Sequence, residues 1–165
     1  MKKLFIILSL TLFTVGCGKE ETVESTSATS PSKEEQTQVK SLLYENEEKG
    51  IRVGDIKHWK LSKEQDSNVV FQNENLQAII TILPNKQDIK SIKRDLIVGA
   101  GDITIIEETD KTLSFQSNRK ESIQTDIFIF QVGEKMNIVT FVGKVDDDEM
   151  NRPKIVEFKE HIQFN

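Results

Sequence analysis

The distribution of apolar residues along the chain decides which part of it can form a hydrophobic core. The basic Met1-Lys2-Lys3 precedes twelve uncharged residues, Leu4 to Val15, which match the apolar segment of a secretory signal peptide. As a helix this segment would extend about 18 Å, against about 30 Å of bilayer hydrocarbon, so it is too short for a transmembrane helix. We therefore expect residues 1–16 to be removed as a signal peptide.

The only cysteine, Cys17, follows this segment directly. The stretch Phe13 to Gly18 (FTVGCG) resembles a bacterial lipobox, in which small residues precede a cysteine that receives lipid and becomes the mature N-terminus. A lone cysteine cannot form an intramolecular disulfide, so its position calls for another explanation. The resemblance implies a lipoprotein held on the extracytoplasmic face of the cell membrane by acyl chains such as palmitate at Cys17. The alternative is an ordinary secretory signal with an unrelated cysteine.

Residues 17–36 are expected to form the lipidated cysteine and a disordered tether. The segment is rich in Ser, Thr and Glu and has little to bury. An alternative interpretation makes Ser32 a helix N-cap with Glu35 as its capping-box partner. The apolar side of that helix would contain Val39, Leu42 and Leu43. We expect one folded domain over residues 37–165.

The charge of the chain argues against two classes of partner. Removal of Lys2 and Lys3 with the signal peptide would leave 20 basic and 27 acidic side chains, a formal charge of −7. Nucleic acid and anionic lipid attract proteins of the opposite sign, so neither is expected to bind this domain.

From about Ser41 the sequence pattern is that of β-strands. Two pairs of apolar, β-branched runs are each separated by turn residues, which predicts two hairpins. The runs are Val69 to Gln72 with Ala78 to Leu83, and Ile103 to Glu107 with Leu113 to Ser117. The turns are Asn73-Glu74-Asn75 and Thr109-Asp110-Lys111.

Polar and apolar residues alternate in the strand that begins at Leu113. Leu113 and Phe115 alternate with Ser114 and Gln116, which predicts one buried and one solvated face. In contrast, Ile123 to Val132 and Met136 to Val145 are apolar on both faces, a pattern typical of central strands.

Two segments have helical periodicity. After Pro84, Asn85 is the expected N-cap of a helix that ends at Gly99 and Gly101, and its apolar stripe is Ile89, Ile92, Leu96 and Ile97. A second helix is expected to start between Asp147 and Pro153, with Pro153 in its first turn. Its stripe is Ile155, Phe158 and Ile162. The predicted fold class is α+β, a mostly antiparallel sheet with helices packed on it.

The segment from Ser41 to Asn165 resembles the PsbP-like family. The resemblance is carried by YENEEKGI at 44–51, by Trp59-Lys60-Leu61, and by the order hairpin, helix, four strands, closing helix. His58 stands where the family often has proline. The resemblance implies an α/β/α sandwich fold. Members of the family include bacterial surface lipoproteins and are typically described as binding or assembly factors.

Four groups of residues are candidates for chemistry, each beside a structural alternative. Asp146-Asp147-Asp148-Glu149 supplies the oxygen ligands that Ca²⁺ prefers, or else caps the following helix. Glu157 and His161, near Glu160, share a helical face and are either part of a zinc site or an exposed ion pair. His58 and Trp59 are either a ligand-stacking pair or an outward histidine beside a core tryptophan.

The fourth group is basic. Lys86, Lys90, Lys93 and Arg94 are expected on the outer face of the first predicted helix, as a solvated surface or a weak docking site for lipid headgroups. Gly99-Ala100-Gly101 is interpreted as a helix stop and not as a dinucleotide-binding loop.

The sequence identifies no catalytic, cofactor-binding or metal-binding residue, and lipid attachment at Cys17 is the one site it assigns. We therefore expect a non-enzymatic binding or assembly module of the cell envelope, with an envelope protein or a small ligand as partner and no cofactor. One alternative is a metal-dependent or hydrolytic envelope factor that uses Asp146 to Glu149 with His161. Another is a structural surface protein without a specific ligand, which predicts no pocket able to bury a small molecule.

Overall fold

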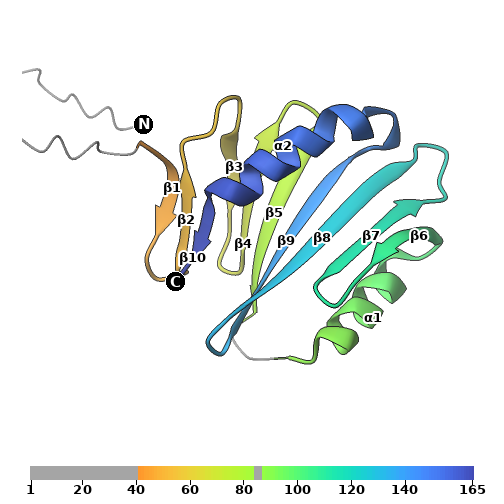
Figure 1. The fold of residues 1–165 in the computed structure, drawn as a ribbon, viewed down its shortest axis with the longest axis horizontal. Helices are drawn as coiled ribbons and strands as arrows, with labels where there is room; N and C mark the ends of the chain where they lie inside the picture. The colour runs from red at the N-terminus through yellow and green to blue at the C-terminus, as the bar shows by residue number, and fades with distance from the viewer. Residues whose placement is uncertain (1–40, 84–86) are drawn as a thin grey trace, which may run out of the picture. The chain divides into compact units, whose positions relative to one another are not determined.

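The computed structural model describes residues 41–83 and 87–165 (Figure 1). The elements in chain order are β1 (Leu42–Asn46), β2 (Ile51–Gly54), β3 (Lys60–Glu64), β4 (Asn68–Asn73), β5 (Leu76–Leu83), α1 (Ile89–Ala100), β6 (Ile103–Glu108), β7 (Thr112–Ser117), β8 (Ile123–Val132), β9 (Lys135–Lys144), the short 3-10 helix η1 (Val145–Asp147), α2 (Asp148–His161) and β10 (Ile162–Phe164). The predicted signal peptide, Cys17, the tether, and the Pro84-Asn85 helix start lie outside the described residues.

The strands form two antiparallel sheets. The larger has seven strands in the order β3-β4-β5-β9-β8-β7-β6, and the smaller has three in the order β1-β2-β10. Both predicted hairpins are present, and β8 pairs with β9 along their whole length from Ile123↔Lys144 to Val132↔Lys135. The prediction of a mostly antiparallel α+β fold with helices packed on the sheet is confirmed.

Two hydrophobic cores lie on opposite faces of the large sheet. On one face, α2 and the small sheet cover β4, β5 and β9 with a cluster that includes Trp59, Phe71, Phe141 and Phe158. On the other face, α1 covers β7, β8 and β9 with a cluster that includes Ile92, Leu113, Phe115, Ile127, Ile129 and Ile138. Figure 1 shows α2 crossing β4, β5 and β9, and α1 beside β6 and β7. The central strands are therefore apolar on both faces, as predicted.

Two local predictions about helices need correction. The N-cap of α1 is Asp88, whose carboxylate accepts a 3.0 Å hydrogen bond from the Ser91 N–H. The helix therefore begins at Ile89, three residues later than an N-cap at Asn85 would place it. Pro153 is the sixth residue of α2 and not part of its first turn. A proline there removes a bond to the Glu149 carbonyl, and Glu149 and Pro153 are both exposed. The stop after α1 is confirmed, because Gly101 has a φ of +80°.

The segment before Trp59 is strand and turn. Leu42 and Leu43, which the alternative helix would have included, lie in β1.

Ile162, expected at the end of the second helix, is instead the first residue of β10, which pairs with β2. The pattern gave no sign of β10, because three residues are too few to show alternation.

Tyr44 on β1 connects the small sheet to β3 through a carboxylate. Its hydroxyl donates a 2.7 Å hydrogen bond to Glu64, which also accepts from Asn46 and pairs with Lys49. The Lys49 ammonium and the Tyr44 hydroxyl hold the pKa of the Glu64 carboxyl below its usual range. Burial, and next the bond to Glu64, raise the pKa of Tyr44 to about 12.

This shift predicts an alkaline loss of stability. Tyr44 is the only tyrosine, so the near-ultraviolet absorbance of phenolate reports it alone, with an expected midpoint near 12 in the folded protein and near 10 after unfolding. A raised pKa stabilises the fold fully below the unfolded value, and that contribution disappears as pH rises through the folded value. Urea unfolding should therefore show a free energy of unfolding that falls between pH 10 and 12. A Tyr44→Phe variant with the same alkaline slope would contradict this assignment.

Candidate ligand-binding recess

The α2-facing side of the large sheet changes from apolar to polar between β9 and β8. One row of paired residues runs across four strands as Glu107 on β6, Ser114 on β7, Asp126 on β8 and Phe141 on β9. The next row pairs Gln116 with Gln124. Beyond Phe141, therefore, the sheet presents hydrogen-bonding side chains to α2 where the core would otherwise continue.

Three of these side chains form a buried hydrogen-bond network. Ser114 and Gln124 are only 6% and 7% exposed. The Ser114 hydroxyl donates to the Asp126 carboxylate, and the Gln124 amide donates to Ser114 Oγ at 2.8 Å and to Asp126 Oδ1 at 3.0 Å. The prediction that the Ser114 face is solvated is wrong, because the β6–β8 end of the sheet is covered by polar contacts and by α2.

One acceptor in this network is unused. Within the described residues, the buried oxygen Oε1 of Gln124 has no hydrogen-bond partner. A buried acceptor without a donor costs about 1–3 kcal/mol, so native proteins rarely keep one unless water or a ligand satisfies it.

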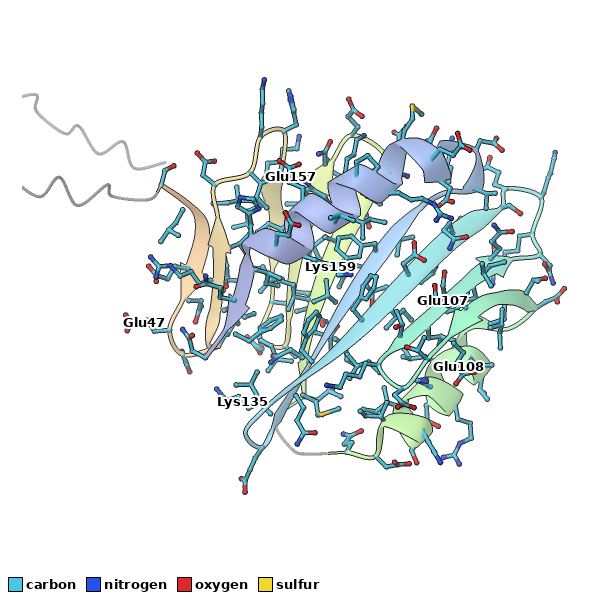
Figure 2. The ribbon with its side chains drawn as sticks, in the orientation of Figure 1. Glu47, Glu107, Glu108, Lys135, Glu157 and Lys159 are labelled. Atoms are coloured by element: carbon cyan, nitrogen blue, oxygen red, sulfur yellow. The ribbon has the colours of Figure 1, made fainter. Side chains whose placement is uncertain are left out.

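A recess of about 310 Å³ lies over the network, between the sheet and α2. Its lining residues are Ile106, Glu107, Ser114, Gln116, Gln124, Asp126, Phe128, Asp148, Arg152, Ile155, Val156 and Lys159. Those from α2 recur at helical spacing, which places them along one side of the helix. In Figure 2 the labelled Lys159 and Glu107 lie to either side of β8.

Each basic side chain of the recess has a partner, and the Arg152 side chain is 71% exposed. Arg152 donates from Nε and Nη2 to Asp148 at 3.0 and 2.9 Å, and this pairing raises the pKa of Arg152. The Lys159 ammonium lies 3.7 Å from the centroid of the Phe128 ring, a cation–π contact. Both cations come from α2, which also supplies Asp148, whereas the acceptors Gln124, Asp126 and Glu107 come from the sheet.

The exposed part of the lining, the mouth of the recess, includes an apolar residue on each side. Ile106 on β6 is 51% exposed and Val156 on α2 is 53% exposed. Ile106 falls where the β6–β7 pairing shifts register between Ile105 and Glu107, and such a bulge changes the direction of a side chain. The recess therefore combines a floor rich in acceptors, cations on one wall and apolar residues at the mouth.

Ser114 and Asp126 are two of the residue types found in a Ser-His-Asp catalytic triad, but the network is not a triad. The Ser114 hydroxyl donates a hydrogen bond directly to a carboxylate, and the lining residues include no histidine that could act as a general base for it. The arrangement is suited to hold a ligand by complementary hydrogen bonds.

The acidic segment Asp146 to Glu149 and His161 lie at opposite ends of α2. His161 lies thirteen positions after Asp148 on the helix, which corresponds to about 20 Å. His161 Nδ1 is 2.8 Å from the Glu157 backbone carbonyl, so the expected ion pair with the Glu157 side chain is wrong. Among residues 41–83 and 87–165, no three His, Cys, Asp or Glu side chains gather as metal ligands.

The acidic segment acts on α2 mainly through charge. Asp147 precedes the helix but makes no side-chain capping bond, which corrects that part of the prediction. Asp148 and Glu149 lie in the first turn, where negative charge is favourable. Trp59 is a core residue, 5% exposed and 4.6 Å from the Phe158 ring centroid, while the neighbouring His58 is exposed, as the structural alternative predicted.

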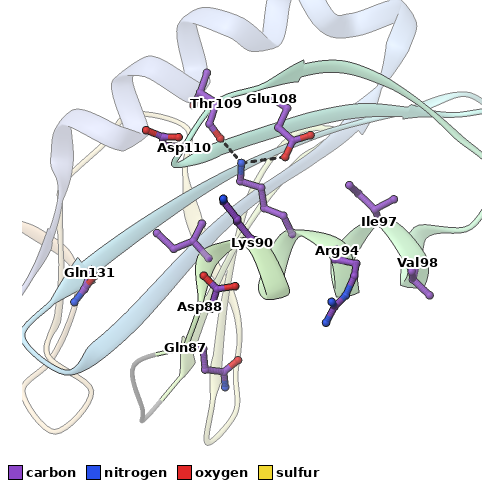
Figure 3. A pocket seen from close by; sticks show the side chains of 12 residues that line it. Gln87, Asp88, Lys90, Arg94, Ile97, Val98, Glu108, Thr109, Asp110 and Gln131 are labelled. Atoms are coloured by element: carbon purple, nitrogen blue, oxygen red, sulfur yellow. Dashed lines mark hydrogen bonds and ion pairs between the residues drawn. The ribbon is translucent and has the colours of Figure 1, made fainter.

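The basic residues of α1 border a second, more open groove of about 860 Å³ (Figure 3). Lys90 and Arg94 are exposed as predicted, but Lys93 is 6% exposed. Its ammonium lies 3.2 Å from Glu108 Oε1 and donates to the Thr109 carbonyl. The prediction failed because a lysine on the edge of an apolar stripe can bury its stem and still reach a polar partner. Lys86 lies outside the described residues.

The recess itself was missed in the sequence. Its only signal is the pair Gln124 and Asp126 at alternate positions near the start of β8, matched by Ser114 and Gln116 on the neighbouring strand. Their pairing, and the α2 residues opposite them, emerge only from the register and the packing of the helix.

No protein-family model matches the chain, and no curated protein matches it either. Similar solved structures exist. The Ran-binding protein Mog1p of Saccharomyces cerevisiae has a TM-score of 0.50 at 9% identity, over 70% of this chain and 90% of Mog1p. Cyanobacterial PsbP (CyanoP) from Synechocystis has a TM-score of 0.49 at 12% identity, over 79% of this chain and 96% of CyanoP.

A protein from Bacteroides thetaiotaomicron has a TM-score of 0.42 at 10% identity, over 70% of this chain, and the chain spans 45% of the length of that protein. At these identities the similarity to Mog1p shows a shared α+β fold and nothing of function. Neither helix in the described part of the chain is long and apolar enough to cross a bilayer.

Proposed function

We propose that this chain is a membrane-anchored extracytoplasmic lipoprotein whose folded domain is a non-enzymatic binding module for a small polar ligand. The observation that carries the binding part is the buried, unpartnered Oε1 of Gln124 in the recess. This oxygen has almost no exposed surface, so a ligand that draws the Gln124 amide toward the recess and donates to Oε1 would recover part of the cost of its burial.

The recess favours a binding role over a purely structural one. A surface spacer without a ligand predicts no pocket that can bury a small molecule, whereas this recess has about 310 Å³ and two buried polar side chains in its floor. Ligand pockets range from roughly 300 to 1,000 Å³, so the recess suits a small ligand.

The geometry gives less support to a metal-dependent or hydrolytic factor. That hypothesis requires Asp146 to Glu149 and His161 to act together, and α2 separates them by about 20 Å.

The membrane anchor rests on the sequence. The uncharged Leu4 to Val15, the small Gly16 and the single Cys17 form a signal peptide that ends in a lipid attachment site. Two or more acyl chains provide stable anchoring where one chain binds only reversibly. The polar segment after Cys17 would hold the domain away from the lipid headgroups.

Replacing Cys17 with alanine is expected to release the protein from the membrane. In cells that express the chain with its own leader, the wild type should sediment with membranes and Cys17→Ala should move to the soluble extracytoplasmic fraction, because alanine cannot receive the acyl chains. Mass spectrometry should find a wild-type mature chain that begins at Cys17 with added acyl mass.

A Ser25→Ala variant in the same segment serves as the matched control and should remain with the membrane. If Cys17→Ala sediments like the wild type, or if the native chain still begins at Met1, the anchor is absent.

The binding role has its own test. Thermal unfolding of the full-length protein in detergent, measured against a library of small polar metabolites, should identify compounds that raise Tm for the wild type and not for Gln124→Met. Methionine has a similar length and lacks the acceptor. A library in which no stabilisation depends on Gln124 would contradict a binding role for the recess.

A further inference from the structure

We propose that the recess binds a free α-amino acid in its zwitterionic form, with an apolar side chain of about the size of leucine. This inference rests on the proposed function, because it assigns a ligand class to the same site. Three features carry it: the acceptors of the floor, the cations of α2 and the apolar residues at the mouth.

The floor is suited to an ammonium group. Gln124 Oε1 is a buried acceptor without a partner among the described residues. Asp126 and Glu107 lie on either side of Ser114 in the same row and add two carboxylates to the lining. An ammonium carries three N–H donors and one positive charge, so it balances the carboxylates, and it can satisfy Oε1 once the Gln124 amide turns toward the recess.

The α2 wall is suited to a carboxylate. Arg152 uses one N–H of Nε and one of Nη2 on Asp148, which leaves other guanidinium donors for a ligand. Lys159 supplies a second positive charge to the lining. These cations repel a simple amine that lacks a negative group, and they attract a ligand with a carboxylate beside its ammonium.

The mouth is suited to an aliphatic side chain. Ile106 and Val156 are each about half exposed and flank the opening, and the buried Ile155 lies between α2 and the sheet. An apolar group placed between Ile106 and Val156 removes apolar surface from water on both residues, which favours leucine over glycine or a charged amino acid.

Calorimetry on the full-length protein in detergent tests the assignment. The probes are L-leucine, isopentylamine, which lacks the carboxylate, and isocaproate, which lacks the amine. Leucine is expected to bind, and each truncated probe is expected to bind at least about tenfold more weakly, because each loses one set of charge-assisted hydrogen bonds. Glucose and Ca²⁺ are included as probes of two other ligand classes.

Two variants test whether leucine binds in the recess. Gln124→Met should weaken leucine binding at least about tenfold, because it removes the free acceptor. Arg152→Met should weaken leucine binding and should not weaken isopentylamine binding, because it removes a carboxylate donor and a cation that repels the amine. The matched controls, Gln77→Met on the exposed side of β5 and Arg94→Met on α1, should bind leucine as the wild type does. Equal urea midpoints would show that each variant is folded.

The outcomes separate this inference from the proposed function. Absence of leucine binding, or leucine binding that Gln124→Met leaves intact, overturns the amino-acid assignment. If glucose or Ca²⁺ binds instead and the binding depends on Gln124, the ligand class is wrong and the recess remains a binding site. If no library compound shows Gln124-dependent stabilisation, the proposed binding function fails as well.

Discussion

Replacing Phe158 with alanine is expected to lower the free energy of unfolding by about 3–5 kcal/mol. The Phe158 side chain is fully buried, and its ring centroid lies 4.6 Å from Trp59, 5.3 Å from Phe71 and 5.7 Å from Phe141. Truncation removes these contacts and leaves a cavity at the point where α2 packs on the sheet. Single domains are stable by only about 5–15 kcal/mol, so this one change removes a large part of the total.

Urea unfolding followed by the fluorescence of Trp59, the only tryptophan, measures the effect. The control is Val156→Ala, two residues away on the same helix and 53% exposed, which should change the free energy of unfolding by no more than about 0.5 kcal/mol. A Phe158→Ala midpoint equal to that of Val156→Ala would show that α2 is not anchored by this ring.

The stripe that contains Phe158 was visible in the sequence, and so were most strands. Ile127 and Ile129 belong to the core under α1, whereas Phe128 and Phe130 pack against the core under α2. Alternation over ten residues determines which side chains share a face, and a strand that is apolar on both faces needs a cover on each side. This is why the layered α+β arrangement could be predicted.

What covers a given face could not be predicted in the same way. Ser114 and Lys93 were both assigned to solvent because they are polar, and both are buried. Ser114 is covered because α2 extends over the polar end of the sheet, and Lys93 because Glu108 and the Thr109 carbonyl receive its ammonium. Each partner lies at a distance in the sequence that periodicity does not reveal.

The recess depends on long-range packing even more. Its floor joins residues of β6, β7 and β8, and its wall comes from α2, which follows a further strand. The sequence showed that β8 carries Gln124 and Asp126 among apolar residues. It did not show that their partners are Ser114 across the register and Arg152 across the recess.

Gly143 on β9 lets α2 pack closely against the sheet, because glycine has no side chain. Replacing Gly143 with leucine is expected to push α2 away from the sheet. A Cβ at Gly143 would lie 2.7 Å from Nδ2 of Asn151 and 3.4 Å from Cδ1 of Leu76. Asn151 is 5% exposed in α2, so its amide has little room to move. Overpacking costs about 1–3 kcal/mol and strand propensity returns less than about 1 kcal/mol, so we expect a net loss of about 1–2 kcal/mol.

Urea unfolding of Gly143→Leu beside Gly99→Leu distinguishes crowding from a general intolerance of larger residues. Nothing lies within 4 Å of a Cβ at Gly99, and leucine favours a helix more than glycine does, so this control should gain up to about 1 kcal/mol. Adding Asn151→Ala to Gly143→Leu should recover part of the loss, because it removes the amide that the new side chain meets.

Since Arg152 follows Asn151 on α2 and Gln124 pairs with Gly143, displacement of the helix should also weaken the binding of any ligand in the recess. If Gly143→Leu keeps wild-type stability, or if Asn151→Ala adds its own cost without any recovery, then the close contact between β9 and α2 does not position the recess wall.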